Sequence, residues 1–310
     1  MAKKRFVLTF LLLIIFVFSS CNNVIEYDFD NTLESKITLF DYESPGNSTN
    51  QRNKPSDRPT EANESLGYKI ENDLFIFNQN KYHIIAVDGG DLSGERQPNV
   101  AVDVGFGDRV YWALTNEYGQ LIIVLADRII LQDDNTEPVN KNGRYYDDEA
   151  KVQGTESPYY DSGHVIADSL GGVSNSYNIT PQNSMLNRHG DQAYMEKIIR
   201  DAGGCENFIA IITYPDTLTH IPSHYHYEYE INGEKIVEDF DNLNPDEVNA
   251  IINQDSSFIE ASELLRIDKN NDGIVTIKEA KEAGYSMPIY SDFWLYKYMI
   301  DGDGDGMVGE

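Results

Sequence analysis

The chain has 310 residues and a formal net charge of −28, with hydrophobic residues at 40% and charged residues at 25%. This length and composition are typical of a globular protein with one sizeable core and a small additional module. The acidic balance argues against a protein that coats DNA, because non-specific affinity for nucleic acid comes mainly from Lys and Arg side chains at phosphates. An enzyme that binds nucleic acid only briefly, with a metal ion supplying positive charge, is compatible with this acidic balance.

The first twenty residues have the pattern of an export signal. A basic head at residues 3–5 precedes a nearly continuous apolar run over residues 6–18, and small residues then lead to Cys21. The run is too short to cross a membrane comfortably. Residues 1–20 resemble a bacterial lipoprotein signal, which implies that Cys21 is lipidated and anchors an extracellular protein to the cell membrane. Simple cleavage and secretion is the alternative.

Residues 21–67 are expected to be a flexible tether. Their second half is rich in Ser, Pro, Asn and charged residues, a composition that cannot bury a core. The sequence has two cysteines, Cys21 and Cys205. If Cys21 is lipidated, no disulfide can form within one chain, and the fold must rely on its core and on bound metal. Nothing in the sequence indicates an oligomeric state.

From residue 68 onward the sequence predicts a sheet. Short runs rich in β-branched and aromatic residues are typical of strands. Such runs lie at residues 74–77, 82–87, 110–114, 121–126, 208–212 and 225–231. Residues 116–119 have turn composition, and Asn232-Gly233 is a strong hairpin signal.

One amphipathic helix is expected among these strands. Apolar residues at positions 195, 198, 199 and 202 follow the spacing of one helix face, and two glycines then end the helix. Mostly strands with one helix indicate an α+β fold on an antiparallel sheet, which we assign to residues 68–240. Residues 241–310 change to helices flanking acidic loops, and we expect them to form a second module.

The segment 161–196 combines residues that suit phosphodiester hydrolysis. A neutral imidazole, here His164, can take a proton from water near neutral pH. A metal ion can polarise the phosphoryl oxygen and stabilise the leaving alkoxide. Amide and carboxylate oxygens, which this segment also supplies, suit a hard cation such as Mg²⁺. A histidine after a glycine is usually structural when it stands alone, but the combination favours catalysis.

This segment resembles the DNA/RNA non-specific endonucleases of the ββα-metal class, also called His-Me finger nucleases. The residues that match the pattern are Asp161, Gly163, His164, Asn178, Pro181, Gln182, Asn187 and Glu196. The resemblance implies an antiparallel sheet carrying a ββα-metal finger. It also implies an endonuclease that hydrolyses DNA, RNA or both with little sequence preference.

The resemblance assigns a role to each site residue. His164 is implied to be the general base, and Asn187 to bind Mg²⁺ or Mn²⁺ directly. Glu196 is implied to position metal-bound water. Asp161 and Asn178 belong to the matching motifs and are expected to complete the site.

Two departures from the family pattern matter. The arginine of the family's histidine motif is Ser162 here, so one cation near the phosphate is missing, and Arg144 is the candidate to replace it in space. The interval from Asn187 to Glu196 is about one residue longer than usual. Asp191, one helical turn after Asn187, is therefore a rival to Glu196.

Two other functions remain open at this stage. Loss of activity through Ser162 would leave a nuclease-like, calcium-dependent binding protein. A zinc-dependent hydrolase would use the histidines at 220, 224 and 226, but no cysteine pair accompanies them, and the alternation of His224 and His226 favours exposed strand positions. Residues 151–230 contain four Lys or Arg against ten Asp or Glu, so a nuclease should bind its substrate weakly and in a salt-dependent way.

Residues 268–279 fit the EF-hand calcium loop. The expected ligands are Asp268, Asn270, Asp272, the carbonyl of Ile274 and Glu279, with Gly273 at the turn position. A second loop begins with Asp301, Asp303 and Asp305 but stops before its twelfth position. We expect it to bind Ca²⁺ weakly or to pair with the first loop as a structural partner.

Overall fold

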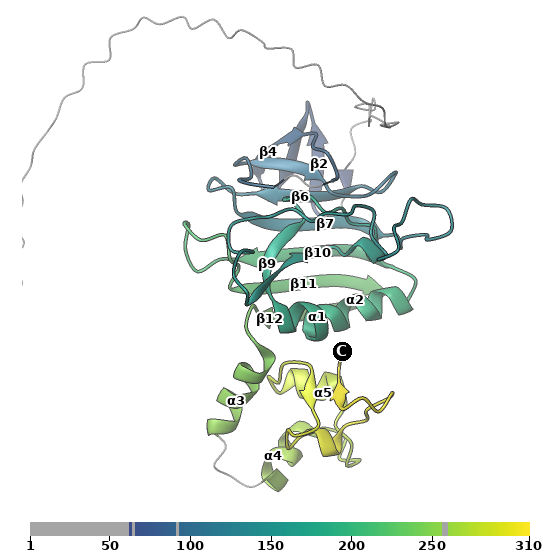
Figure 1. Ribbon diagram of the computed structural model, residues 1–310, viewed down its shortest axis with the longest axis vertical. Helices are drawn as coiled ribbons and strands as arrows, with labels where there is room; N and C mark the ends of the chain where they lie inside the picture. The colour runs from purple at the N-terminus through teal and green to yellow at the C-terminus, as the bar shows by residue number, and fades with distance from the viewer. Residues whose placement is uncertain (1–61, 64–65, 91–92, 256–259) are drawn as a thin grey trace, which may run out of the picture. The chain divides into compact units, whose positions relative to one another are not determined.

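The computed structural model describes residues 62–63, 66–90, 93–255 and 260–310 (Figure 1). The expected signal segment 1–20 and the lipidation site Cys21 lie outside the described residues, as does most of the expected tether. The short strand β1 (Ala62–Asn63) falls within the range assigned to that tether. Within the described part of the chain, no helix has both the length and the apolar character needed to cross a membrane.

The fold is of mixed α+β type and is dominated by a sheet of ten strands. In sheet order these are β1, β2 (Tyr68–Glu71), β3 (Leu74–Phe77), β4 (Asn80–Ile85), β5 (Val100–Asp103), β6 (Tyr111–Thr115), β7 (Leu121–Ile129), β10 (Cys205–Thr213), β11 (His224–Ile231) and β12 (Glu234–Asp241). Neighbouring strands are antiparallel except for β4 and β5, which are parallel. The expected antiparallel sheet is therefore confirmed for every neighbouring pair but one.

The sequence of β11 shows why these strands have one buried and one partly exposed face. Tyr225, Tyr227 and Tyr229 are fully buried and alternate with polar residues that are only partly buried. This is the period of two that an antiparallel strand imposes on its side chains. At Asn232 and Gly233 both φ angles are positive, as the tight turn from β11 to β12 requires.

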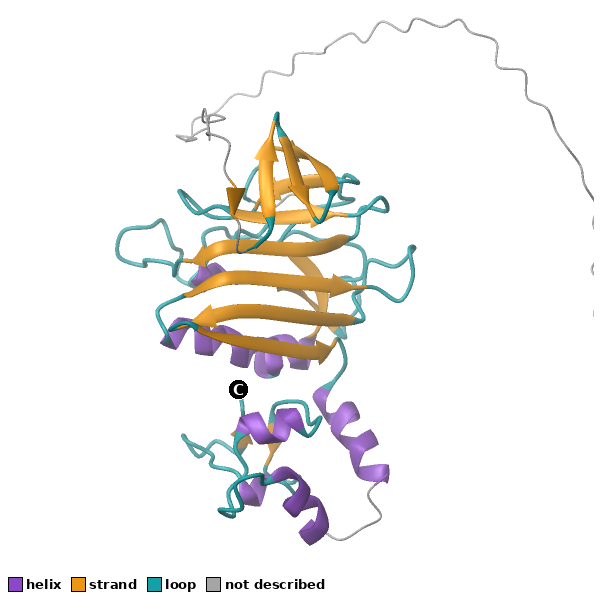
Figure 2. Ribbon diagram, turned by 180° about the vertical axis from the view of Figure 1, so that it is seen from behind, coloured by secondary structure: helices purple, strands orange, loops and turns teal. Residues whose placement is uncertain are grey.

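A separate two-stranded hairpin carries the histidine. It consists of β8 (Tyr160–His164) and β9 (Ile179–Asn183), and the short 3-10 helix Asp168–Leu170 lies in the connection between them. Helices α1 (Ser184–His189) and α2 (Asp191–Asp201) follow directly. Figures 1 and 2 show this β8–β9–α1–α2 unit on one face of the large sheet.

The main core lies between that face of the sheet and the helices. Met195 and Ile199 of α2 are fully buried and belong to the same cluster as Phe208 of β10 and Tyr227 of β11. The helix predicted from residues 195–202 is therefore confirmed, although α2 begins four residues earlier. Gly203 and Gly204 follow its end with positive φ angles, as expected.

Residues after β12 form helices and short strands around a small core of their own. The elements are α3 (Pro245–Asp255), α4 (Glu260–Ile267), α5 (Ile277–Glu282), β13 (Ile289–Tyr290), the 3-10 helix Tyr296–Tyr298 and β14 (Met307–Val308). Their core contains Ile267, Val275, Ala280, Tyr285, Met287, Ile289 and Leu295. We call residues 242–310 the C-terminal module. The change to helices and acidic loops predicted from the sequence is present.

Candidate active site

The β8–β9 hairpin places the predicted residues in register. Asp161 lies opposite Gln182, and His164 at the end of β8 lies opposite Ile179. A Cβ atom at Gly163 would collide with the side chain of Gln182, which is fully buried. Glycine at this position therefore lets the two strands close over a large polar side chain.

Asn178 ties down the connection between the two strands. Its side-chain oxygen accepts a hydrogen bond from the backbone nitrogen of Ile166 at 3.0 Å. Its amide nitrogen donates to the carbonyl oxygens of Ile166 and Val173, each at 2.8 Å. The side chain is fully buried. All three of these hydrogen bonds are made to backbone atoms, so Asn178 stabilises the chain that follows His164.

His164 is nearly enclosed, with 10% of its side chain exposed. Its Nε2 atom lies 3.3 Å from Oγ of Ser174 and 3.4 Å from Oδ2 of Asp168. Burial lowers the pKa of His164 to about 4, with the charge of Glu149 opposing and that of Arg144 adding to this effect. The imidazole is therefore neutral at physiological pH and able to accept a proton, which is the state that a general base needs.

Glu196 is linked to His164 through a residue that the sequence did not single out. The amide nitrogen of Gln192 donates both to Oε1 of Glu196, at 2.9 Å, and to the backbone carbonyl oxygen of His164, at 3.3 Å. Burial raises the pKa of Glu196 to about 7. Arg200, one turn further along α2, lies 3.7 Å from the other carboxylate oxygen of Glu196.

Asn187 meets the same hairpin at Asp161. The amide nitrogen of Asn187 donates to Oδ2 of Asp161 at 3.3 Å. Arg188 holds the same carboxylate with two hydrogen bonds, of 2.8 Å and 2.7 Å. Because the side-chain nitrogen of Asn187 faces Asp161, the side-chain oxygen of Asn187 is turned away from that carboxylate. This oxygen is the atom that can ligate a hard cation.

The donor set fits a hard divalent cation. Asn187 on α1 and Glu196 on α2 both connect to β8, one through Asp161 and the other through Gln192 and the backbone of His164. An amide oxygen and a carboxylate are ligands that suit Mg²⁺ or Mn²⁺, with water completing the coordination. The structure thus groups His164, Asn187 and Glu196 around one strand.

Asp191, the rival to Glu196, has other partners. It is buried and lies at the first position of α2. Its carboxylate pairs with Nζ of Lys281 at 2.9 Å and accepts a hydrogen bond from Oγ of Ser286 at 2.8 Å. Both partners belong to the C-terminal module. Of the two carboxylates, Glu196 is therefore the one connected to the histidine strand.

Two cations lie beside the hairpin on the segment that precedes it. Arg144 pairs with Glu149 at 2.6 Å and is close enough to lower the pKa of His164. Nζ of Lys151 lies 3.4 Å from Oγ of Ser162, which stands where the endonucleases that this segment resembles have an arginine. The suggestion that Arg144 replaces the missing cation stays a prediction, since Lys151 is the cation that contacts Ser162. Lys151 was missed because no local pattern relates it to the histidine motif.

The histidines considered for zinc lie elsewhere. His224 and His226 are partly exposed on β11, on the face opposite the buried tyrosines. Nδ1 of His224 lies 2.8 Å from Asp241, and Nδ1 of His226 lies 2.7 Å from Asp239, both on the neighbouring strand β12. This arrangement agrees with the expectation of exposed strand histidines.

The first acidic loop lies between α4 and α5, as a helix–loop–helix. Asp268 and Glu279, at its two ends, are 6% and 8% exposed. The backbone nitrogen of Lys269 donates to Oε1 of Glu279 at 3.0 Å, which draws the two ends together. Oδ2 of Asp268 accepts from the backbone nitrogen of Gly273 at 2.9 Å. Both end carboxylates of this loop therefore accept hydrogen bonds from its backbone nitrogens.

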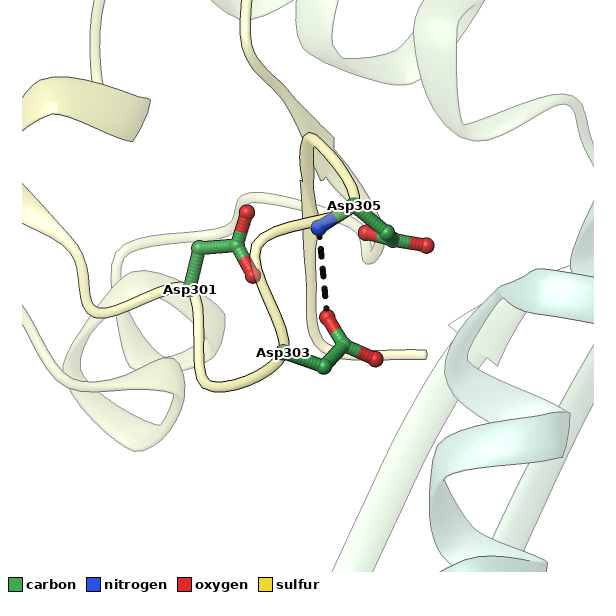
Figure 3. Close-up of side chains that lie close together, drawn as sticks. All are labelled: Asp301, Asp303 and Asp305. Carbon is green, nitrogen blue, oxygen red and sulfur yellow. Dashed lines mark hydrogen bonds between the residues drawn. The ribbon is translucent and has the colours of Figure 1, made fainter.

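The second acidic loop gathers three carboxylates. Oxygen atoms of Asp301, Asp303 and Asp305 all lie within 4.8 Å of one another (Figure 3). The backbone nitrogen of Asp305 donates to Asp303 at 3.4 Å. The strand at the end of this loop, β14, pairs with β13. The alternative expectation, that this loop pairs with the first loop, is not met by these strands.

Comparison with known proteins relates the middle of the chain to a nuclease family. Residues 129–233 match the family of DNA/RNA non-specific endonucleases. The matching segment contains the β8–β9–α1–α2 unit and all five predicted catalytic residues: His164, Asn187, Glu196, Asp161 and Asn178. No curated protein matches the sequence.

Solved structures that resemble this fold include two of NucA from Streptococcus agalactiae. The structure with magnesium bound is 17% identical in sequence to this chain. The match covers 57% of this chain and 84% of the NucA chain, with a TM-score of 0.34. The structure without metal is 15% identical, and its match covers 57% of this chain and 83% of the NucA chain, with a TM-score of 0.31.

Proposed function

We propose that this protein is an exported, metal-dependent endonuclease that hydrolyses phosphodiester bonds in DNA, RNA or both with little sequence preference. The observation that carries the proposal is the neutral, buried His164 on a strand that also contacts Asn187 and, through Gln192, Glu196. The match of residues 129–233 to the non-specific endonuclease family supports the same reaction.

In this proposal each side chain has a defined task. The neutral imidazole of His164 takes a proton from water, and the resulting hydroxide attacks phosphorus and displaces the leaving alkoxide oxygen. Asn187 and Glu196 would hold a divalent cation and its water, and that cation would supply positive charge to the phosphoryl and leaving oxygens. Asp161, paired with Arg188, holds the amide of Asn187 in place. Arg144 and Lys151 attract the phosphate.

The C-terminal module is proposed to bind calcium at residues 268–279. Asp268, Asn270, Asp272, the carbonyl of Ile274 and Glu279 supply the ligands, and the near-burial of Asp268 and Glu279 supports this assignment. Extracellular modules of this kind bind Ca²⁺ at roughly 10⁻⁴ to 10⁻³ M. The second loop, with Asp301, Asp303 and Asp305, is proposed as a weaker site.

Export and anchoring remain proposals that rest on the sequence. The apolar run at residues 6–18 and Cys21 support a lipoprotein signal, which would place the protein outside the cell on the membrane surface. Secretion after simple cleavage is the alternative, and mass spectrometry of the mature N-terminus distinguishes the two.

One nuclease assay tests the main proposal. Purified protein is incubated with plasmid DNA and with RNA, in Mg²⁺, Mn²⁺ or EDTA, beside the variants His164→Ala and His226→Ala. We expect metal-dependent degradation that falls by about 100-fold or more in His164→Ala, the usual contribution of a general base. His226→Ala is the matched control, because His226 lies on β11 and pairs with β12.

Two outcomes of this assay would contradict the proposal. Intact nucleic acid in every lane would favour an inactive, calcium-dependent binding protein, with Ser162 as the change responsible. Activity restored by Zn²⁺ alone would favour a zinc-dependent hydrolase.

A further inference from the structure

A lysine of the C-terminal module is buried against two carboxylates of the sheet-and-helix body. Nζ of Lys281, on α5, lies 2.9 Å from Oδ1 of Asp191 on α2 and also pairs with Glu238 on β12. The exposed fractions of the three side chains are 16%, 3% and 8%. Few charged side chains are buried to this extent unless they are paired.

The charges within this cluster depend on one another. Burial alone would lower the pKa of Lys281, but the negative charges of Asp191 and Glu238 raise it, so the ammonium group stays charged. Removing one partner of such a cluster leaves an uncompensated charge out of water, which is strongly destabilising. The contact between the module and the body therefore depends on Lys281.

Further contacts of the same module hold the start of α2. Oγ of Ser286 and the backbone nitrogen of Met287 donate to Oδ2 of Asp191, at 2.8 Å and 3.3 Å. The Lys281 ammonium also lies 5.5 Å from the centre of the Tyr194 ring, one turn along the helix. The first turn of α2 is therefore fixed from the module side.

The next residue of α2 faces the candidate active site. Gln192 follows Asp191 and bonds both the backbone oxygen of His164 and the carboxylate of Glu196. Asp191 thus contacts the module, and the next residue, Gln192, contacts both His164 and Glu196. A shift in the first turn of α2 would move Gln192 and Glu196 together.

On the module side, the same lysine stands close to the calcium loop. Glu279, the twelfth residue of the loop, lies in α5 two positions before Lys281. Thr276 and Glu279 form a capping box that begins this helix. The orientation of α5, and therefore of Lys281, depends on how Glu279 is held by the loop.

We infer that Lys281 is a positioning residue for helix α2, through which calcium in the 268–279 loop strengthens metal binding at Asn187 and Glu196. This inference rests on the proposed function, because it joins the two proposed metal sites. It goes beyond that function in making the C-terminal module a working part of the nuclease.

The test compares the full chain with two charge-removing variants of the same helix. Lys281→Met removes the buried ammonium group and keeps a side chain of similar length. Lys278→Met is the matched control, because Lys278 is also on α5 but is exposed. Ser286→Ala, which removes a single hydrogen bond to Asp191, is a milder variant should Lys281→Met fail to fold.

Two readouts are needed, one of them independent of activity. Hydrogen exchange of residues 191–201 is measured with and without Ca²⁺. In the wild type and in Lys278→Met we expect Ca²⁺ to slow exchange by about tenfold, because a stabilised local element opens less often. In Lys281→Met this effect should be lost, while calorimetry still detects Ca²⁺ binding. The second readout is the Mg²⁺ concentration for half-maximal nuclease activity, which Ca²⁺ should lower in all but Lys281→Met.

Several results would overturn the inference. Equal calcium protection of α2 in Lys281→Met and wild type would show that the lysine does not transmit the effect. A wild type that binds Ca²⁺ without any change in α2 would do the same, and a wild type that binds no Ca²⁺ would remove both the calcium site and the coupling. A wild type without nuclease activity would contradict only the proposed function, because hydrogen exchange of residues 191–201 would still test whether Lys281 couples calcium to α2.

Discussion

Glu196 is a carboxyl group that burial keeps partly protonated near neutral pH. Its pKa is raised from 4.5 to about 7, so ionising it in the folded protein costs free energy. A carboxyl whose pKa is higher in the folded state stabilises the fold below its unfolded pKa. That contribution is lost as the pH rises through the folded value. A function that needs the ionised form therefore works against stability in the absence of metal.

The first prediction follows from this conflict. Glu196→Gln should raise the free energy of unfolding of the metal-free protein at pH 8 by about 1–3 kcal/mol, and change it little at pH 4, where Glu196 is protonated. The same variant should lose nuclease activity. Urea unfolding in EDTA at both pH values measures the difference. Equal free energies of unfolding for variant and wild type at pH 8 would show that ionising Glu196 does not destabilise the fold.

Arg144 carries a charge that reaches the candidate base. Burial is the main cause that lowers the pKa of His164, and the charge of Arg144 adds to it; the Arg144 side chain is 40% exposed and therefore open to a phosphate. Arg144→Met should therefore lower kcat/KM by about tenfold and reduce the slope of log affinity against log salt by about one. Arg128→Met is the control, since Arg128 is more exposed and pairs with Glu206. Equal effects of the two variants would contradict a local role for Arg144.

At the level of single residues, the sequence predicted those that stand in recognisable motifs. His164 and Asn187 are separated along the chain, yet His164 lies on β8 and Asn187 contacts Asp161 of the same strand, while their catalytic roles stay predictions. Gln192 and Lys151 were not predicted, because their importance comes from tertiary contacts that no local spacing encodes. Asn178 was predicted as a site residue, and its contacts assign it to support of the backbone.

At the level of elements, the β8–β9 hairpin depends on the buried amide of Asn178. Replacing it with alanine would leave one backbone nitrogen and two backbone carbonyl oxygens without their partner. We expect Asn178→Ala to lower the free energy of unfolding by about 2–4 kcal/mol, because unsatisfied buried polar groups are costly. It should also reduce activity by displacing the strand end that carries His164.

Urea denaturation and nuclease assays measure both effects of Asn178→Ala. Asn142→Ala is a suitable control, because Asn142 is exposed in a loop. If the two variants unfolded at the same urea concentration, the hydrogen bonds of Asn178 would not be holding the hairpin together.

The strands that were predictable from the sequence are those with long apolar or regularly alternating runs. The predicted runs correspond to β3, β4, β6, β7, β10 and β11. The strand β12 was missed because five of its eight residues are charged. The parallel pairing of β4 and β5 was also missed, because strand partners are chosen by contacts distant in sequence. Helix α2 begins before its apolar periodicity, at the polar pair Asp191 and Gln192.

At the level of the whole molecule, the net charge of −28 opposes a polyanionic substrate. We expect the metal-free protein to bind DNA with at best micromolar affinity, weakening further between about 50 and 200 mM salt. Fluorescence anisotropy with a labelled duplex in EDTA measures this affinity. Nanomolar binding without metal would show a cationic surface that the sequence does not reveal.

The change from strands to helices near residue 241 was predictable from the sequence. The elements that follow β12 have a hydrophobic cluster separate from that of the sheet, and the division into two domains stays a prediction. The contact between them was not predictable, because nothing in the sequence around Lys281 distinguishes it from the exposed Lys278. Its burial follows only from the positions of Asp191 and Glu238.

The last strand of the large sheet has a consequence for solubility. Among the residues that the structure describes, β12 is the last strand at its end of the sheet, and the edge strand of a sheet is where another chain can pair. Glu234, Lys235, Asp239 and Asp241 line it, and three of these four side chains are acidic. A second copy approaching edge to edge would bring like charges together. The charges of β12 therefore oppose edge-to-edge association of two sheets, beside the contact that Glu238 of this strand makes with Lys281 of the C-terminal module.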